Sequence, residues 1–151
     1  MASGPPPRRL SDDALSDLLT GHCFGTLATI KRSGHPHLTT MIYGWDPAAR
    51  VVRFFTTAGR VKVRHIQHNP RAALHVPGPD VWSYAVAEGE AEVSDITREP
   101  GDAIGQEIWE MLPKQMRPDD QDSFYLSLVE EHRVVIRLNV DRLYGAALDQ
   151  G

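Results

Sequence analysis

Short segments of β-type sequence, separated by turn residues, follow one another along most of the chain. β-Branched, aromatic and small apolar residues fill these segments, and clusters such as residues 31–34 and 46–49 supply the turns between them. Because the helical segments between them are few and short, the pattern predicts a mainly β, α+β protein: a small β-barrel with short helices at its rim. The expected strands are residues 24–30, 35–45, 51–56, 72–76, 81–93 and 133–140, with residues 143–145 closing the fold.

Capping residues and helical periodicity predict the helices. Ser11 is a good N-cap for a helix that Gly21 ends. Residues 1–10, which are rich in proline, are expected to form a flexible lead-in, and residues 11–151 a single domain. The other expected helices are residues 60–68, 102–111 and 123–131.

The overall composition is that of an ordinary globular domain. The chain has 151 residues, 41% of them hydrophobic and 24% charged, so it can bury a core of its own. The net charge of -4 argues against broad nucleic-acid binding, and no apolar run is long enough to span a membrane. A single cysteine rules out an internal disulfide and fits the reducing cytoplasm, where we expect the protein to act.

A local basic stretch stands out in this acidic chain. Residues 50–71 contain no acidic residue, and they are predicted to form a strand, a glycine turn and the start of a helix. Thr56 and Thr57 supply hydroxyl groups before the turn, and Arg60 and Lys62 supply cations after it. Free N–H groups and the helix dipole favour a phosphate at such a helix start. The stretch therefore predicts an anion-binding cradle, with a solvated basic helix face as the alternative.

Several short motifs, in their order and spacing, are similar to those of a known family. They are FGTLAT at residues 24–29, GHPHLTT at 34–40, KVRHI at 62–66, NPRAAL at 69–74, WSYAVAEGEA at 82–91, and residues 135–136 with 144–145. Over residues 11–145 the chain resembles the split-barrel, FMN-binding-like proteins related to pyridoxamine 5′-phosphate oxidase. Within that family it looks like the actinobacterial branch that uses the deazaflavin coenzyme F420.

That resemblance implies a homodimer with two cofactor sites at the subunit interface. It implies that a threonine-rich strand runs along the cofactor ring, that the predicted cradle holds the phosphate, and that an aromatic segment approaches from the partner subunit. The strand threonines are equally explained by β-propensity, and the aromatic residues by an interface core. The residues so implied are Thr39, Thr40, Met41 and Ile42 for the ring, Phe55, Thr56, Thr57, Arg60 and Lys62 around the cradle, and Trp82, Ser83 and Tyr84 from the partner.

The resemblance also implies an activity: hydride transfer from reduced coenzyme F420 to a small organic acceptor. Two alternatives stay open, an FMN-dependent oxidase or reductase on the same fold, and a non-catalytic flavin- or deazaflavin-binding protein. The C-terminal substrate motif of the vitamin B6 oxidases is missing, which argues against pyridoxal phosphate synthesis. F420 carries an acidic glutamyl tail, for which the basic stretch supplies Arg50, Arg53, Arg64 and Arg71 as candidate partners.

Side chains for catalysis or metal binding are harder to identify. No catalytic residue is predicted, and Tyr43 is only a candidate general acid. Two histidine pairs, His35 with His37 and His65 with His68, have spacings that suit a metal. No cysteine or carboxylate beside either pair completes a ligand set, so we expect no metal site.

Overall fold

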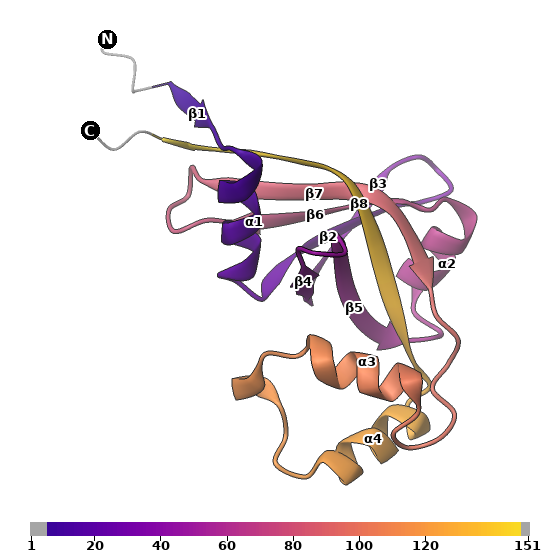
Figure 1. Cartoon of the computed structure of the whole chain (residues 1–151). Coiled ribbons are helices and arrows are strands. Elements are labelled where there is room, and N and C mark those ends of the chain that lie inside the picture. The colour runs from indigo at the N-terminus through magenta and orange to yellow at the C-terminus, as the bar shows by residue number, and fades with distance from the viewer. Residues whose placement is uncertain (1–5, 149–151) are drawn as a thin grey trace.

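The computed structural model describes residues 6–148 as one curled antiparallel sheet with helices packed against it (Figure 1). Its strands are β1 (Pro7–Arg9), β2 (Phe24–Ile30), β3 (Pro36–Ile42), β4 (Gly44–Asp46), β5 (Val51–Thr57), β6 (Arg71–Pro77), β7 (Tyr84–Val93) and β8 (Arg133–Leu148). Its helices are α1 (Asp12–Thr20), α2 (Val61–His68), α3 (Ala103–Met111) and α4 (Gln121–Glu130), with a 3-10 turn at Lys114–Met116.

The strand order explains how the sheet makes an open barrel. The order is β3-β2-β6-β7-β8-β5-β4, with β1 paired to β8. Curling brings β3 back into contact with β5, but no ladder of hydrogen bonds joins these two strands in the described part of the chain. The barrel is therefore split between β3 and β5, which confirms the predicted mainly β split-barrel fold.

The hydrophobic core lies on the inner face of the curled sheet. Leu27, Phe54 and Leu74 occupy inward positions on three strands and are fully buried. From α1, Leu15 and Leu19 pack into the same cluster. Each of these side chains contributes roughly 1.5–3 kcal/mol by its burial. This core fixes the curvature of the sheet and so the position of the split.

A second, smaller core attaches α3 and α4 to the outer face of β5 and β8 (Figure 1). Ile108 of α3 and Leu128 of α4 pack on Val135 of β8, with Phe55 of β5 beside them. Asp102 caps α3 by accepting the N–H of Gly105 at 2.9 Å. The helices therefore cover only one end of the outer face, and the outer face of β2, β3 and β6 carries no helix.

The structure confirms the local signals at most element ends. The Ser11 hydroxyl accepts the N–H of Ala14 at 3.1 Å, as expected of the N-cap of α1. The turn of residues 31–34 closes the β2–β3 hairpin with Gly34 at φ 88°. The ladder between β7 and β8 shifts register at Glu88/Gly89, which is a β-bulge. The last predicted helix, residues 123–131, begins earlier, at Gln121, because Asp120 caps it.

The expected single strand of residues 35–45 is wrong, because the chain breaks at Tyr43. Before the break β3 pairs with β2, and after it β4 pairs with β5, so the two halves belong to opposite sides of the split. The Tyr43 side chain is fully buried, and its hydroxyl donates to the carbonyl oxygen of Leu19 at 2.6 Å. This anchor to α1 turns the backbone away from β2.

The strand expected at residues 81–93 begins later, at Tyr84. Trp82 and Ser83 instead lie in a turn, where their N–H groups donate to the Asp80 carboxylate at 2.8 and 2.9 Å. The strand expected at residues 133–140 is longer than predicted and continues to Leu148.

The lead-in expected to be flexible is partly a strand. Pro7–Arg9 forms β1 and pairs with the end of β8, where Pro7 lies opposite Leu148. Residues 1–5 lie outside the described residues. Across residues 6–148, no helix has the length and apolar character needed to cross a membrane.

Candidate cofactor-binding site

Two free strand edges face each other across the split of the barrel. Strand β3 is paired on one side only, with β2. Strand β5 is paired with β8 along its length, but β4 covers only its first part, at Val51, Val52 and Arg53. Successive backbone groups of an edge strand alternate in direction, so half of those in β3 point outward to a ligand or water. The split therefore offers two rows of backbone donors and acceptors to a flat polar molecule.

Strand β3 is the segment expected to run along the cofactor ring. The ladder places Thr39 opposite Leu27 and Met41 opposite Gly25, so these two side chains lie on the inner face. Thr40 and Ile42 lie on the outer face. The Thr39 hydroxyl oxygen is buried, and it has no hydrogen-bond partner in the described chain. A buried polar atom of this kind is ordinarily satisfied by a bound ligand or water.

The start of α2 closes one end of the split. Strand β5 ends at Thr57, and a short turn leads to Arg60, the N-cap of α2, whose side chain accepts no capping hydrogen bond. The N–H of Val63 donates to the Arg60 carbonyl at 3.1 Å, which leaves the N–H groups of Val61 and Lys62 available to an anion, and the helix dipole favours negative charge there. Thr57 is half-buried at this end, whereas the Thr56 side chain is buried on the inner face.

Lys62 adds an unneutralised charge to this helix start. It is half-buried and makes no hydrogen bond or ion pair within residues 6–148. Burial and the neighbouring charge of Arg60 lower the pKa of Lys62 below its ordinary value. No counter-ion among the described residues offsets these two causes, and a bound phosphate would supply one. We call Thr57, Arg60, Lys62 and the N-terminal turn of α2 the phosphate cradle.

The remaining predicted residues lie elsewhere in the chain. The Phe55 side chain faces α3 and α4, under the guanidinium of Arg133 at 5.5 Å from the ring centroid. Trp82 is 65% exposed, and Tyr84 stacks on His75 with ring centroids 5.5 Å apart. The β6–β7 connection that carries Trp82 and Ser83 lies at the opposite end of the sheet from α2 (Figure 1). Within one chain, the segment that carries Trp82 and Ser83 therefore lies away from the phosphate cradle.

Comparison with known proteins decides the family. The profile of the pyridoxamine 5′-phosphate oxidase family matches residues 11–146, nearly the whole chain. The chain belongs to this family. The resemblance predicted from the motifs is thereby confirmed.

Two of the proteins that this chain is similar to are named for F420. An F420H(2)-dependent biliverdin reductase of Mycobacterium tuberculosis is 29% identical over 140 residues, which are 92% of this chain and 90% of that protein. A solved F420 reductase is 28% identical with a TM-score of 0.59, covering 85% of this chain and 94% of that one. A conserved hypothetical protein of M. tuberculosis has a TM-score of 0.71 at 23% identity, covering 96% and 89% of the two chains, and shows the shared fold.

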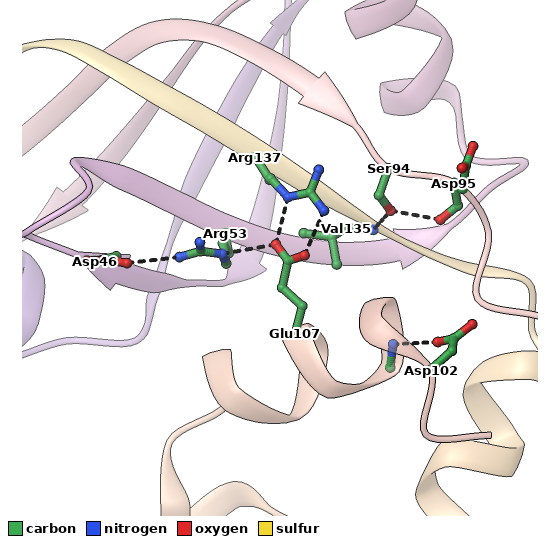
Figure 2. Close-up of polar contacts among 9 residues, drawn as sticks. Asp46, Arg53, Ser94, Asp95, Asp102, Glu107, Val135 and Arg137 are labelled. Carbon is green, nitrogen blue, oxygen red and sulfur yellow. Dashed lines mark hydrogen bonds and ion pairs between the residues drawn. The ribbon is translucent and has the colours of Figure 1, made fainter. Parts of the chain in front are cut away.

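The basic stretch, residues 50–71, offers fewer unpaired positive charges than its sequence predicts. Arg50 pairs with Asp12 at 3.1 Å, so its charge is neutralised from α1. Figure 2 shows Glu107 of α3 reaching Arg53 of β5 at 3.0 Å and Arg137 of β8 at 2.6 Å. The expectation that the charges of Arg50 and Arg53 stay available to a cofactor tail is therefore wrong. Asp12 and Glu107 lie far away in the sequence, whereas Asp46, which also pairs with Arg53 at 3.4 Å, lies seven positions before it.

Tyr43 is no longer a candidate general acid. The Tyr43 hydroxyl is held by the Leu19 carbonyl, and burial raises the pKa of Tyr43 well above its ordinary value. A buried phenol that already donates to the backbone cannot donate to a substrate in the split. Tyr43 is a structural anchor.

The histidine pairs are brought together only in part. His37 of β3 meets His65 of α2 edge to face, with ring centroids 5.2 Å apart. In the part of the chain that the structure describes, no group of three or more His, Cys, Asp or Glu side chains is arranged to hold a metal ion.

Proposed function

We propose that this protein binds reduced coenzyme F420 and uses it to reduce a small organic acceptor. The observation that carries the proposal is the phosphate cradle: an uncapped helix start with Arg60 and unpaired Lys62, beside two free strand edges. The relatives named for F420 use, at 28% and 29% identity, support the same cofactor class.

The residues present fit such a cofactor. The cradle would take its phosphate, and the outward backbone groups of β3 would hydrogen-bond the polar edge of its ring. The buried Thr39 hydroxyl, which has no partner in the described residues, gives that strand one further donor or acceptor. When bound, the reduced deazaflavin supplies a hydride equivalent. The chain positions the ring and keeps water from one of its faces. Because Tyr43 is no longer a candidate general acid, we infer that solvent supplies the product proton.

FMN is the second candidate cofactor, and one observation favours it. FMN also carries a phosphate, so the cradle serves it equally well. The neutralisation of Arg50 by Asp12 and of Arg53 by Glu107 removes two of the cations expected to prefer the acidic tail of F420. Of the four arginines named for the tail, Arg64 and Arg71 remain exposed.

We expect F420 to bind more tightly than FMN, with an advantage that shrinks as salt rises. The phosphate contact is common to both ligands, whereas the tail contacts are exposed and therefore screened. The check is a pair of fluorescence titrations, one for each cofactor, at low and at high ionic strength. Equal or tighter binding of FMN at both salt concentrations would promote an FMN-dependent oxidoreductase.

We also propose that the protein is a homodimer that completes each site with residues of both subunits. The register aligns Phe24 with Ile42 and Ala28 with Leu38, on the outer face that no helix covers. Phe24 is 52% exposed and Leu38 62% exposed, which is unusual for large apolar side chains on one sheet face. A two-fold partner on this face would bring its own Trp82 toward the cradle that the same chain cannot reach.

Sedimentation at micromolar concentration should give twice the mass of the chain. Leu38→Lys should shift the mass toward the monomer, because it places a charge in a buried apolar interface. Leu126→Lys is the matched control, since Leu126 is 48% exposed and lies on α4, away from the outer face of β2 and β3. A stable wild-type monomer that still binds the cofactor would contradict the shared site.

A further inference from the structure

A cavity lies between the β2–β3 turn and one face of α2, next to the phosphate cradle. Its volume is about 480 Å³. No carboxylate is among the described residues that line it, and Lys62 is not among them either. The charged and titratable side chains that line it are Lys31, Arg32, His37, Arg64, His65 and His68.

Periodicity explains why these side chains converge. Arg64, His65 and His68 of α2 follow Val61 at i+3, i+4 and i+7, so they share one face of the helix. Lys62 is one residue on from Val61, about 100° round the helix axis. The β2–β3 hairpin supplies the opposite wall, and the N–H of Lys31 donates to the carbonyl of His35 at 2.9 Å to close its turn.

The cavity wall contains polar groups that are left unsatisfied. His65 shares a hydrogen bond of 3.0 Å with the Thr29 hydroxyl through its Nδ1. The neighbouring His37 has a buried Nδ1 atom with no partner among the residues described. Such an atom is ordinarily satisfied by a bound ligand or water. This atom of the wall therefore still lacks a hydrogen-bond partner.

The charges around this cavity are also uncompensated. Within residues 6–148, Lys31 and Arg32 form no ion pair, and Arg64 donates only to the Gly59 carbonyl, at 3.1 Å. Burial, followed by the charges of His37, Lys31 and Arg64, lowers the pKa of His65. Cations gathered in a recess without acids raise the local concentration of anions.

We propose that this cavity is a second anion-binding site that takes a ligand with two or more carboxylate or phosphate groups. Cations reach it from two elements, Lys31 and Arg32 from the hairpin turn and Arg64 from α2, so one univalent anion would leave most of them unpaired. The occupant is either the acidic tail of the coenzyme or a separate small polyanion. Only the first of these rests on the function proposed above.

The histidines give this site a pH signature. His37 and His65 face each other, and His68 lies one turn further along α2, in a cavity that Lys31, Arg32 and Arg64 also line. Protonation of the histidines adds charge where the anion binds, so binding should tighten as pH falls through the histidine range. A fixed-charge surface patch would show no such dependence.

Calorimetric titration of the whole protein with a triglutamate peptide and with inorganic phosphate tests the site. We expect the peptide to bind more tightly than phosphate, and more tightly at about pH 6 than at about pH 8. The double change Lys31→Gln with Arg32→Gln should weaken the peptide about tenfold or more, and these exposed turn positions leave the fold intact. Arg98→Gln, which changes an exposed arginine outside the cavity, should leave peptide binding unchanged.

Three results would overturn the proposed site: no peptide binding at either pH, full binding by the double variant, or an equal loss of binding on Arg98→Gln. Coenzyme titration of the double variant then identifies the occupant. Weaker coenzyme binding assigns the cavity to the tail, and unchanged coenzyme binding with weakened peptide binding assigns it to a separate polyanion. If the wild type fails to bind the coenzyme, the proposed function fails, while the peptide titration still reports on the cavity.

Discussion

Replacing Lys62 with alanine should weaken coenzyme F420 binding by one to two decades and leave the fold intact. A charge-assisted hydrogen bond to a phosphate contributes roughly 1.5–3 kcal/mol, which corresponds to that loss of affinity. Stability should change little, because Lys62 has no partner within residues 6–148 that its removal would strand. The measurement is a fluorescence titration beside a urea unfolding curve.

The matched control for this change is Lys114→Ala. Lys114 is exposed in the 3-10 turn Lys114–Met116 and lies outside the cradle, so its loss removes the same charge from the chain. Coenzyme affinity should be unchanged in this variant. An equal loss of affinity in both variants would mean that net charge, and not the cradle, determines binding. Unchanged affinity on Lys62→Ala would place the phosphate elsewhere.

Replacing Glu107 with alanine should lower the free energy of unfolding by roughly 1.5–3 kcal/mol, the range for hydrogen bonds to charged groups. The Glu107 side chain is 20% exposed, and it receives hydrogen bonds from Arg137 at 2.6 and 2.7 Å and from Arg53 at 3.0 Å (Figure 2). Its removal leaves two half-buried guanidinium groups without this partner and removes the polar contacts of Glu107 between α3 and the sheet. Urea unfolding at neutral pH measures the loss.

Glu110→Ala is the control, because Glu110 lies on the same helix and the change has a similar effect on helix propensity. Its side chain is 77% exposed and 3.9 Å from Arg117, so we expect almost no change. Equal stabilities for the two variants would show that the Glu107 contacts contribute nothing.

The Glu107 contribution should also depend on pH. Hydrogen bonds from Arg137, and to a lesser degree from Arg53, hold the pKa of Glu107 below its ordinary value despite its burial. A lowered native pKa means that the contribution is complete above the unfolded-state pKa of about 4.3 and is lost as pH falls through the native value. The stability difference between wild type and Glu107→Ala should therefore shrink in acid. A constant difference down to about pH 2 would contradict this linkage.

The features that could be predicted from sequence are those set by neighbouring residues. The Ser11 cap and the turn at Gly34 each depend on the chemistry of one short segment, and both lie where the sequence indicates. The placement of Arg60 and Lys62 at the start of a helix after β5 is of the same kind. Family resemblance added the split-barrel fold, which no single segment determines.

The features that were missed depend on residues far apart in the chain. Arg50 lies 38 positions from Asp12, and Arg53 lies 54 positions from Glu107, so the stretch itself gave no sign of its neutralisation. The break at Tyr43 has the same origin, since it depends on a hydrogen bond to Leu19, 24 positions earlier. Local alternation predicts a continuous strand there, and tertiary packing overrides it.

The most direct test of the account is anaerobic mixing of the wild-type protein with reduced coenzyme F420 and a panel of organic acceptors, followed by the fluorescence of the oxidised deazaflavin. We predict coenzyme oxidation well above the uncatalysed rate for at least one acceptor. Lys62→Ala should slow it at low coenzyme concentration and recover at saturation, because the cradle binds the coenzyme and does not react. Absence of turnover with every acceptor, together with turnover supported by bound FMN, would contradict the central claim.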